Sequence, residues 1–199
     1  LPFDPAQAPR PKEGAAALAE TLRRKLDAVT NLDEDRILRR FLNVIECTLR
    51  TNAWQRRADG APAPYLAFKL DSRLLDELPR PRPFREIWVY ATRFEAIHLR
   101  GGKVARGGLR WSDRREDFRT EVLGLMKAQM VKNAVIVPVG SKGGFVLKQP
   151  PEGREALQAE VVHCYKAFIQ GLLDLTDNLS GTRVLPPKDV VRWDEDDPY

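Results

Sequence analysis

The sequence predicts an α/β domain: a mixed β-sheet flanked by helices, with a helical lead-in at the N-terminus. Two observations support this prediction. Helical patterns come first in the chain, and short strand-like segments then alternate with two long helical patterns, an order typical of α/β domains. A polar segment rich in glycine and proline separates the two parts. We therefore expect residues 1–60 to form a helix pair and residues 61–199 to form the α/β domain.

The composition is that of an ordinary soluble globular protein. Of the 199 residues, 43% are hydrophobic and 31% are charged, as in folded domains generally. No apolar run approaches the ~20 residues needed to span a bilayer, and the N-terminus lacks the zones of a signal peptide. Two cysteines, Cys47 and Cys164, are too few and too far apart for a disulfide framework or a CxxC metal site. We therefore expect a reduced, cytoplasmic setting.

The helical lead-in is predicted from residue propensity and spacing. Residues 13–29 favour a helix, and Asn31 with Glu34 has the spacing of a capping box for a second helix. Apolar residues recur at helical spacing in this second helix, so we expect one of its faces to pack in the core. These residues are Ile37, Leu38, Phe41, Leu42, Ile45 and Leu49.

The α/β part is predicted from alternating and β-branched apolar segments. The expected strands are residues 65–71, 85–92, 96–102, 134–139 and 143–149. Helices are expected at residues 115–132 and 152–176. The predicted buried face of the longer helix consists of Leu157, Val161, Tyr165, Phe168 and Leu172.

One stripe of the first of these helices changes character along its length. It is apolar at Val122 and Leu125 and polar at Gln129 and Lys132, all at spacings of three or four residues. A stripe that turns polar indicates a helix leaving the core and entering a cleft. A lysine charge and an amide donor on one face suit a carboxylate ligand. The alternative is that Lys132 only complements the dipole at the helix C-terminus.

A second lysine, Lys142, lies in the sequence "VGSKGG", which we expect to be a loop after a buried strand. Residues that follow a strand's carboxyl end often line a ligand crevice, and glycines let a substrate approach the backbone. In a dry pocket beside another cation, a lysine has a lowered pKa and can act as a general base. The alternative is a hairpin turn with Lys142 in water.

Other catalytic chemistries have little support in the sequence. There is no GxxxxGK[ST] phosphate loop and no GxGxxG dinucleotide fingerprint. The two histidines, His98 and His163, offer little for a Ser–His–Asp, Cys–His or metal site, so we expect both to be structural or surface residues.

Residues 107–145, "GGLRWSDRREDFRTEVLGLMKAQMVKNAVIVPVGSKGGF", resemble the substrate domain of glutamate dehydrogenases, most closely the large, NAD-specific bacterial form. The shared frame is a Gly-Gly-Leu-Arg opening, a helix ending in lysine, a strand with proline and a glycine loop holding a lysine. A weaker resemblance extends over residues 88–199 and includes "RVLPPKDVVRWDEDDPY".

The resemblance implies oxidative deamination of L-glutamate to 2-oxoglutarate and ammonia with NAD. Lys142 matches the catalytic lysine, which activates water to attack the imine left by hydride transfer. Asp189 matches the aspartate that assists proton transfer, and Lys132 with Gln129 matches the pair that holds the substrate α-carboxylate. The opening glycines, Gly107 and Gly108, are implied substrate-binding residues.

The pocket for the substrate side chain is less closely matched. Leu123 stands where small glutamate dehydrogenases carry a helix lysine, and relatives acting on leucine or phenylalanine carry an apolar residue there. Lys127, Arg110 or Arg114 could bind the side-chain carboxylate instead. We favour glutamate as the substrate, with an apolar amino acid as the alternative.

The resemblance further implies that residues 61–199 are the substrate-binding domain and that the NAD-binding domain is absent from this chain. We expect the chain to be inactive alone and the complete enzyme to be a homo-oligomer. No membrane partner and no metal are expected.

A binding module is the competing interpretation. The net charge is +5 and the pI is about 9.4, and residues 100–115 hold six basic residues against one acid. Such a stripe could bind phosphates or nucleic acid with a steep dependence on salt. Since no RNP or KH motif accompanies it, we regard nucleic acid as an improbable partner. The helices could also serve contacts between subunits.

Overall fold

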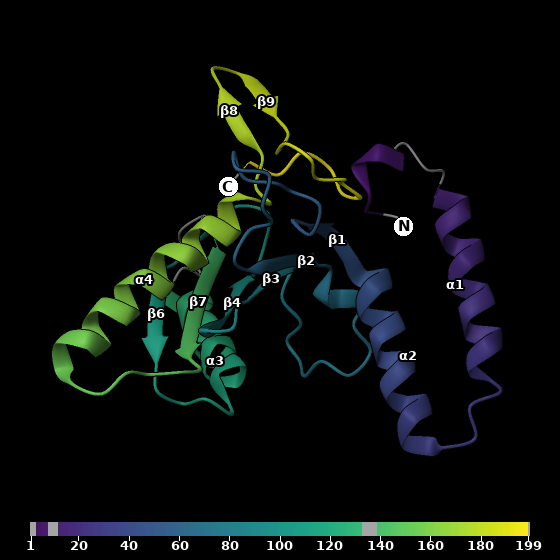
Figure 1. The fold of residues 1–199 in the computed structure, drawn as a ribbon, viewed down its shortest axis with the longest axis horizontal. Coiled ribbons are helices and arrows are strands. Elements are labelled where there is room, and N and C mark those ends of the chain that lie inside the picture. Colours follow the sequence, from purple (N-terminus) through teal and green to yellow (C-terminus); the bar gives the residue numbers. More distant parts are fainter. Residues whose placement is uncertain (1–2, 8–11, 133–138, 199) are drawn as a thin grey trace.

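A mixed sheet forms the centre of the molecule. The computed structural model describes residues 3–7, 12–132 and 139–198 (Figure 1). The strands are β1 (Thr48–Thr51), β2 (Leu66–Leu70), β3 (Arg85–Tyr90), β4 (Phe94–Arg100), β5 (Ala105–Arg106), β6 (Leu109–Ser112) and β7 (Val139–Leu147). Their order is β1-β2-β3-β4-β7-β5, and β6 also pairs with β7. Neighbours from β1 to β7 run antiparallel, whereas β5 and β6 run parallel to β7. The predicted α/β class with a mixed sheet is confirmed.

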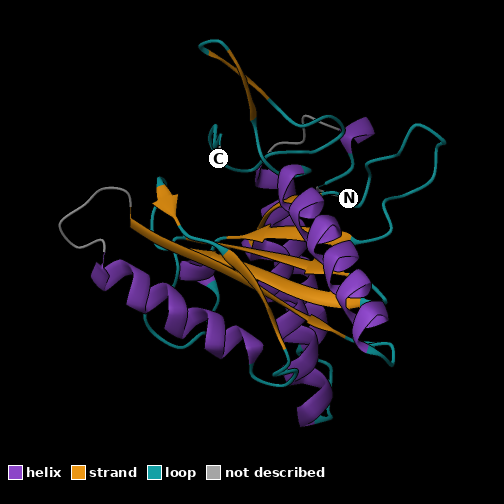
Figure 2. Cartoon of the chain, turned by 90° about the vertical axis from the view of Figure 1, so that its left-hand side faces the viewer, coloured by secondary structure: helices purple, strands orange, loops and turns teal. Residues whose placement is uncertain are grey.

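Two helices cover opposite faces of this sheet, because alternate residues of each strand point to opposite sides. The helix α4 (Arg154–Leu173) packs through Phe168 against Phe145 and the other inward residues of one face. The helix α3 (Phe118–Lys132) packs through Val122 and Met126 against Leu99 on the other face. Figure 2 shows the strands running between these helical layers. A separate hairpin of β8 (Asn178–Ser180) and β9 (Arg183–Leu185) projects at the top of Figure 1.

The lead-in consists of a 3-10 turn at Pro5–Gln7 and the helices α1 (Lys12–Leu26) and α2 (Leu32–Cys47); a second 3-10 turn, Ser72–Leu74, lies between β2 and β3. As predicted, Asn31 caps α2: its side-chain oxygen accepts hydrogen bonds from the backbone N–H of Asp33 at 3.0 Å and of Glu34 at 3.2 Å. The first strand of the sheet, β1, follows α2 directly and lies within the first 60 residues.

The expectation that α2 buries its apolar face is wrong. Leu42 is buried, but Ile37 and Ile45 are each 51% exposed and Phe41 is 63% exposed. Leu38 is also exposed, and Leu49 belongs to β1 instead of the helix. The contacts of α2 with the segments beside it are made partly by polar side chains. Arg39 pairs with Asp27 beyond the end of α1, and Asn43 donates to the carbonyl of Leu74.

On α4 the predicted face is confirmed at Phe168, which is fully buried, and at the partly buried Leu157, Val161 and Leu172. Tyr165 is 38% exposed, and Cys164 is buried on the core side of the helix. No helix in the described parts of the chain is long and apolar enough to cross a membrane.

The loop predicted around Lys142 is wrong. One strand, β7, runs from Val139 to Leu147 and includes the whole "VGSKGG" segment. Lys142 pairs with Leu99 of β4 in regular antiparallel register. Both the loop and the hairpin alternative are therefore excluded. Of the strand predicted at 134–139, residues 134–138 lie outside the described part of the chain.

Candidate active site

The polar end of α3 lies where the sequence places it. Along the stripe, Val122 is buried, Leu125 and Gln129 are half-buried, and Lys132 is exposed at the last position of the helix. This rise in exposure confirms that the stripe leaves the core toward the C-terminus of α3. Gln129 and Lys132 are three residues apart, so their side chains can reach one small ligand.

The C-terminal turn of α3 lies directly on β7. Gly140 is buried, and a Cβ built on it would come within 3.0 Å of Cβ of Gln129 and 2.8 Å of the backbone nitrogen of Met130. Only glycine allows this approach. The glycines of "VGSKGG" therefore act as places of close packing inside a strand, which explains why the expected loop is not formed.

Gly107 and Gly108 lie between β5 and β6, at the edge of β7 opposite to β4. A Cβ on Gly107 would fall 1.5 Å from the carbonyl oxygen of Ser141, so no other residue fits there. A Cβ on Gly108 would lie 3.9 Å from Nζ of Lys142. The half-buried Lys142 thus lies between the turn before β6 and the α3 side of the sheet. The structure brings together Gly107, Gly108, Gln129 and Lys142 around the first half of β7.

Two further predicted residues lie at the surface, and a third position lies in the core. Lys127 is exposed on α3. Arg110 of β6 forms an ion pair with Glu121 at 3.3 Å, and Glu121 also accepts a hydrogen bond from Ser112. Leu123, which stands where small glutamate dehydrogenases carry a lysine, is 3% exposed and packs in the core between α3 and the sheet.

The structure does not bring Asp189 into this group. Asp189 is exposed, has a left-handed backbone with φ of 56°, and lines a cavity of about 330 Å³ together with Tyr65 and Asp174. Neither Gln129 nor Lys142 lines that cavity. Tyr65 donates a hydrogen bond of 2.8 Å to Asp174, and burial together with this bond raises the pKa of the Tyr65 hydroxyl.

A cluster of buried charges lies between the sheet and the C-terminal residues of the chain. The patterns in the sequence did not predict it. Three cations project from three strands: Arg50 from β1, Lys69 from β2 and Arg100 from β4, each at most 2% exposed. Three carboxylates meet them: Asp177, Asp194 and Asp197. We call this the buried ion cluster. Two of its acids belong to residues 192–197, a segment that we call the strap.

Each cation of the buried ion cluster holds more than one partner. Arg50 pairs with Asp194 at 2.6 Å and with Asp177 at 3.0 Å, and it donates to the carbonyls of Leu175 and Glu195. Lys69 lies between Asp194 and Asp197, with 2.6 Å to each. Arg100 donates to both oxygens of Asp197 and to the carbonyl of Lys103.

Burial and pairing shift the titration of these groups. Burial lowers the pKa of Lys69, although Asp194 opposes the shift. Burial by itself would raise the pKa of Asp197, but the hydrogen bonds from Arg100 and Lys69 outweigh it and hold that pKa well below its usual value. Neighbouring His98 is buried in β4, and burial together with the charge of Arg100 lowers its pKa to about 3. His163 is exposed on α4.

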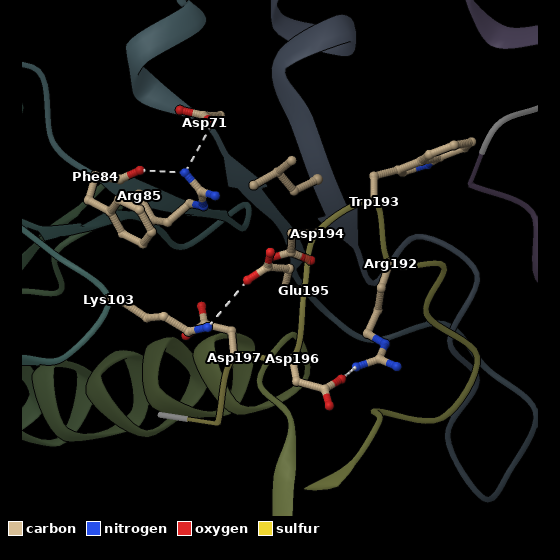
Figure 3. Close-up of a pocket in the computed structure, with 11 residues that line it drawn as sticks. Asp71, Phe84, Arg85, Lys103, Arg192, Trp193, Asp194, Glu195, Asp196 and Asp197 are labelled. Atoms are coloured by element: carbon tan, nitrogen blue, oxygen red, sulfur yellow. Dashed lines mark hydrogen bonds and ion pairs between the residues drawn. The ribbon is translucent and has the colours of Figure 1, made fainter. Parts of the chain in front are cut away.

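A cavity of about 590 Å³ lies between the strap and the start of β3 (Figure 3). Its charged groups are paired with one another. Arg85 pairs with Asp71 at 3.0 Å, Lys103 with Glu195 at 3.5 Å, and Arg192 with Asp196 at 2.6 Å.

The sequence held one signal for the buried ion cluster. Lys69 alternates with Phe68 and Leu70 in a predicted half-buried strand, on the same side as the fully buried Ala67. A lysine at an inward position requires an acidic partner, and the acidic residues 194–197 were available. Within the described ranges, no group of histidine, cysteine or acidic residues could hold a metal ion. Cys47 and Cys164 are free and buried.

A mixed sheet flanked by helices is the fold class that the resemblance to the substrate domain of amino-acid dehydrogenases implies. The family model described as "Bacterial NAD-glutamate dehydrogenase, catalytic domain" matches residues 21–199. The chain belongs to this family.

Three relatives named "NAD-specific glutamate dehydrogenase" agree with this assignment. The protein of Halomonas elongata is 58% identical over 202 residues, which cover 100% of this chain and 12% of that protein. The protein of Pseudomonas aeruginosa is 62% identical over 176 residues, covering 87% of this chain and 11% of that protein. The protein of Mycobacterium tuberculosis is 56% identical over 195 residues, covering 93% and 12%. The chain thus spans about one-eighth of the length of these relatives.

Proposed function

We propose that this chain is the substrate-binding and catalytic part of an NAD-dependent glutamate dehydrogenase, which converts L-glutamate to 2-oxoglutarate and ammonia. The observation that carries the proposal is the family match over residues 21–199, which includes α3, β7 and the opening glycines. The names and the 56–62% identity of the bacterial relatives support it.

We assign NAD, the hydride acceptor of such reactions, mainly to a part of the complete protein outside these residues. The sequence contains no GxGxxG turn to hold a pyrophosphate. The 199-residue chain, mixed with glutamate and NAD, is therefore expected to give no sustained formation of NADH. Robust turnover by the chain alone would contradict this assignment.

Lys142 is the proposed general base. It is half-buried on β7, and its Nζ lies 3.9 Å from the position that a Cβ on Gly108 would take. An amine in this place can take a proton from an attacking water molecule.

Gln129 and Lys132 are the proposed carboxylate-binding pair. The lysine supplies charge and the amide supplies a directed hydrogen bond. For the side-chain carboxylate we propose Lys127 or Arg110, of which Arg110 would have to share its charge with Glu121. Leu123 is occupied in the core and gives no support to an apolar substrate.

Asp189 is proposed to assist proton transfer on the basis of the resemblance alone. Neither Lys132 nor Lys142 lines the cavity that Asp189 lines, so this role stays a prediction. If it holds, Asp189→Asn lowers kcat in the complete enzyme while leaving the KM for glutamate within about twofold, since proton transfer and binding are separate terms.

The general base is tested by Lys142→Ala in the complete enzyme. We expect kcat to fall by about 10²–10⁴-fold, the usual contribution of a positioned acid or base. Lys166→Ala, at an exposed position of α4, is the matched control and should leave kcat unchanged. A loss of less than about tenfold for Lys142→Ala would remove the lysine from the chemical step.

The carboxylate pair is tested by Lys132→Met. Loss of a charge-assisted hydrogen bond should raise the KM for glutamate by about tenfold or more. The same variant should change the KM for NAD little. Equal rises in both constants would speak against a specific contact with the carboxylate.

The phosphate-binding alternative is weakened because several basic residues of residues 100–115 already have partners within the domain. Arg100 is buried against Asp197, Arg110 is paired with Glu121, and Arg115 donates to the carbonyl of Lys148. We therefore leave nucleic acid out of the proposal. We further propose a cytoplasmic location, because the two cysteines are free and buried. On the basis of the resemblance alone, we propose that the complete enzyme is a homo-oligomer.

A further inference from the structure

The face of the sheet that carries α3 is only partly covered by helices. The helix α3 packs on β4 and β7. Beside it, over β2 and β3, lies a cavity of about 670 Å³ with a largely apolar lining. We call it the α2–α3 groove, because α2 forms one wall and the first turn of α3 forms the other. Its floor includes Leu70, Trp88 and Ile97, and its walls include Phe41, Val44 and Phe118.

One floor residue of the groove, Trp88, belongs to a row of aromatic rings on this face of the sheet. The rings of Phe68 and Trp88 stack with centroids 5.9 Å apart, and the ring of Tyr90 lies 5.5 Å from that of Trp88. Trp88 is half-buried and Tyr90 is 38% exposed. In α/β domains such a surface is ordinarily covered by a helix.

The apolar surface continues from the groove onto α2. Phe41 and Val44 line the groove, and Ile37 and Ile45 extend the exposed apolar face along the helix. From Ile37 to Ile45 this face is about 12 Å long at 1.5 Å per residue. A small molecule in the groove would leave most of it in water, whereas a second helix laid along α2 would cover it.

Three arginines at the rim already have partners inside the domain. Arg119 pairs with Glu86 at 2.7 Å, Arg40 pairs with Glu77, and Arg39 pairs with Asp35 at 2.7 Å. Binding at the groove therefore depends on apolar area more than on new ion pairs, and an occupant needs an apolar face with a polar outer side.

We propose that the α2–α3 groove is the docking site of an amphipathic helix supplied by the same polypeptide from outside these 199 residues. The Halomonas elongata relative matches this chain along its whole length, yet the match covers only 12% of that protein. Most of such a polypeptide thus remains to supply the helix. A segment tethered to the domain has an effective concentration of order mM, which favours it over a separate partner.

The proposal is tested by photo-crosslinking in the complete protein. Phe41 and Trp88 are each replaced by the photoreactive analogue p-benzoylphenylalanine, which keeps the aromatic ring. An equal mixture of isotope-labelled and unlabelled protein distinguishes links within one polypeptide from links between two. The same replacement of Thr182, at the exposed turn of the β8–β9 hairpin, is the control.

We expect both groove positions to link to one short peptide from outside residues 1–199, within the same polypeptide. The linked positions should be separated by helical spacing of about three, four or seven residues. Thr182 should not link to that peptide. Links between labelled and unlabelled protein would assign the groove to a second copy and overturn the proposal. Absence of links at Phe41, or links to two unrelated segments, would overturn it as well. Because no activity is measured, the outcome is independent of the proposed function.

Discussion

The outer face of α2 and the end of the sheet beneath the strap reverse the usual distribution of side chains. On α2, Phe41 is 63% exposed, while at the sheet end Arg50 is fully buried. The difference lies in which partners the domain itself provides. The strap supplies carboxylates that satisfy the buried cations, so burial of charge is tolerated there. Nothing in the described chain is packed over the outer face of α2, and apolar residues stay in water.

The largest effect is expected from breaking the buried ion cluster at Asp197. Asp197→Asn leaves Lys69 and Arg100 buried with one carboxylate fewer. We expect a loss of about 3–5 kcal/mol in the free energy of unfolding of the 199-residue chain, measured in urea. Asp196→Asn removes the neighbouring exposed partner of Arg192 and should cost at most about 1 kcal/mol. Similar losses for both variants would show that burial does not decide the energetics of the strap.

A smaller effect is expected from pH at the same end of the sheet. The pKa of His98 is about 3 in the fold and about 6.5 in an unfolded chain. Between these values the unfolded state binds the extra proton, so stability falls as the pH falls below 6.5. At pH 5 the loss should be about 2 kcal/mol relative to pH 7.5.

The control for this pH effect is His98→Gln, which removes the titrating group. The loss between pH 7.5 and pH 5 should disappear in this variant. The lowered carboxylate pKa values of Asp177 and Asp197 act only at more acidic pH, so they do not obscure the comparison. An unchanged pH dependence in His98→Gln would show that His98 is not the group responsible.

The smallest effect is expected on the outer face of α2. In the isolated chain, Phe41→Ser should change the free energy of unfolding by no more than about 0.5 kcal/mol, as for other surface substitutions. Its neighbour Leu42 is buried, and Leu42→Ala should cost about 2 kcal/mol or more. Equal costs at these adjacent positions would mean that Phe41 is already covered in the isolated chain.

Much of the fold follows from local patterns in the sequence. Alternation places β2, β3 and β4 within one or two residues of their observed bounds, and Asn31 caps α2 as its side-chain chemistry requires. The spacing of apolar residues in residues 32–47 predicts that α2 is a helix with one apolar face. It cannot say which neighbour covers that face, because the arrangement of helices is decided by packing partners distant in the chain or outside it.

The segment around Lys142 shows a second limit of local patterns. Glycines serve tight turns and close packing equally well, and a single sequence does not separate the two uses. Here Gly140 admits the end of α3, so the chain continues as a strand through Lys142. Gln129, Lys132 and Lys142 could be proposed as site residues because the pattern that suggests them is local in the chain. The buried ion cluster was missed because Lys69 and Asp194 are 125 residues apart in the chain.

The strap also has a consequence for the solubility of the domain. The strand β1 ends one side of the sheet, and open strand edges are templates for pairing with other chains and for aggregation. The backbone N–H of Trp193 donates to the carbonyl of Leu49 at 3.0 Å, so the strap occupies part of this edge. The buried ion cluster therefore does more than fix the strap in position: by holding it against β1, it shields a sheet edge that would otherwise invite association between molecules.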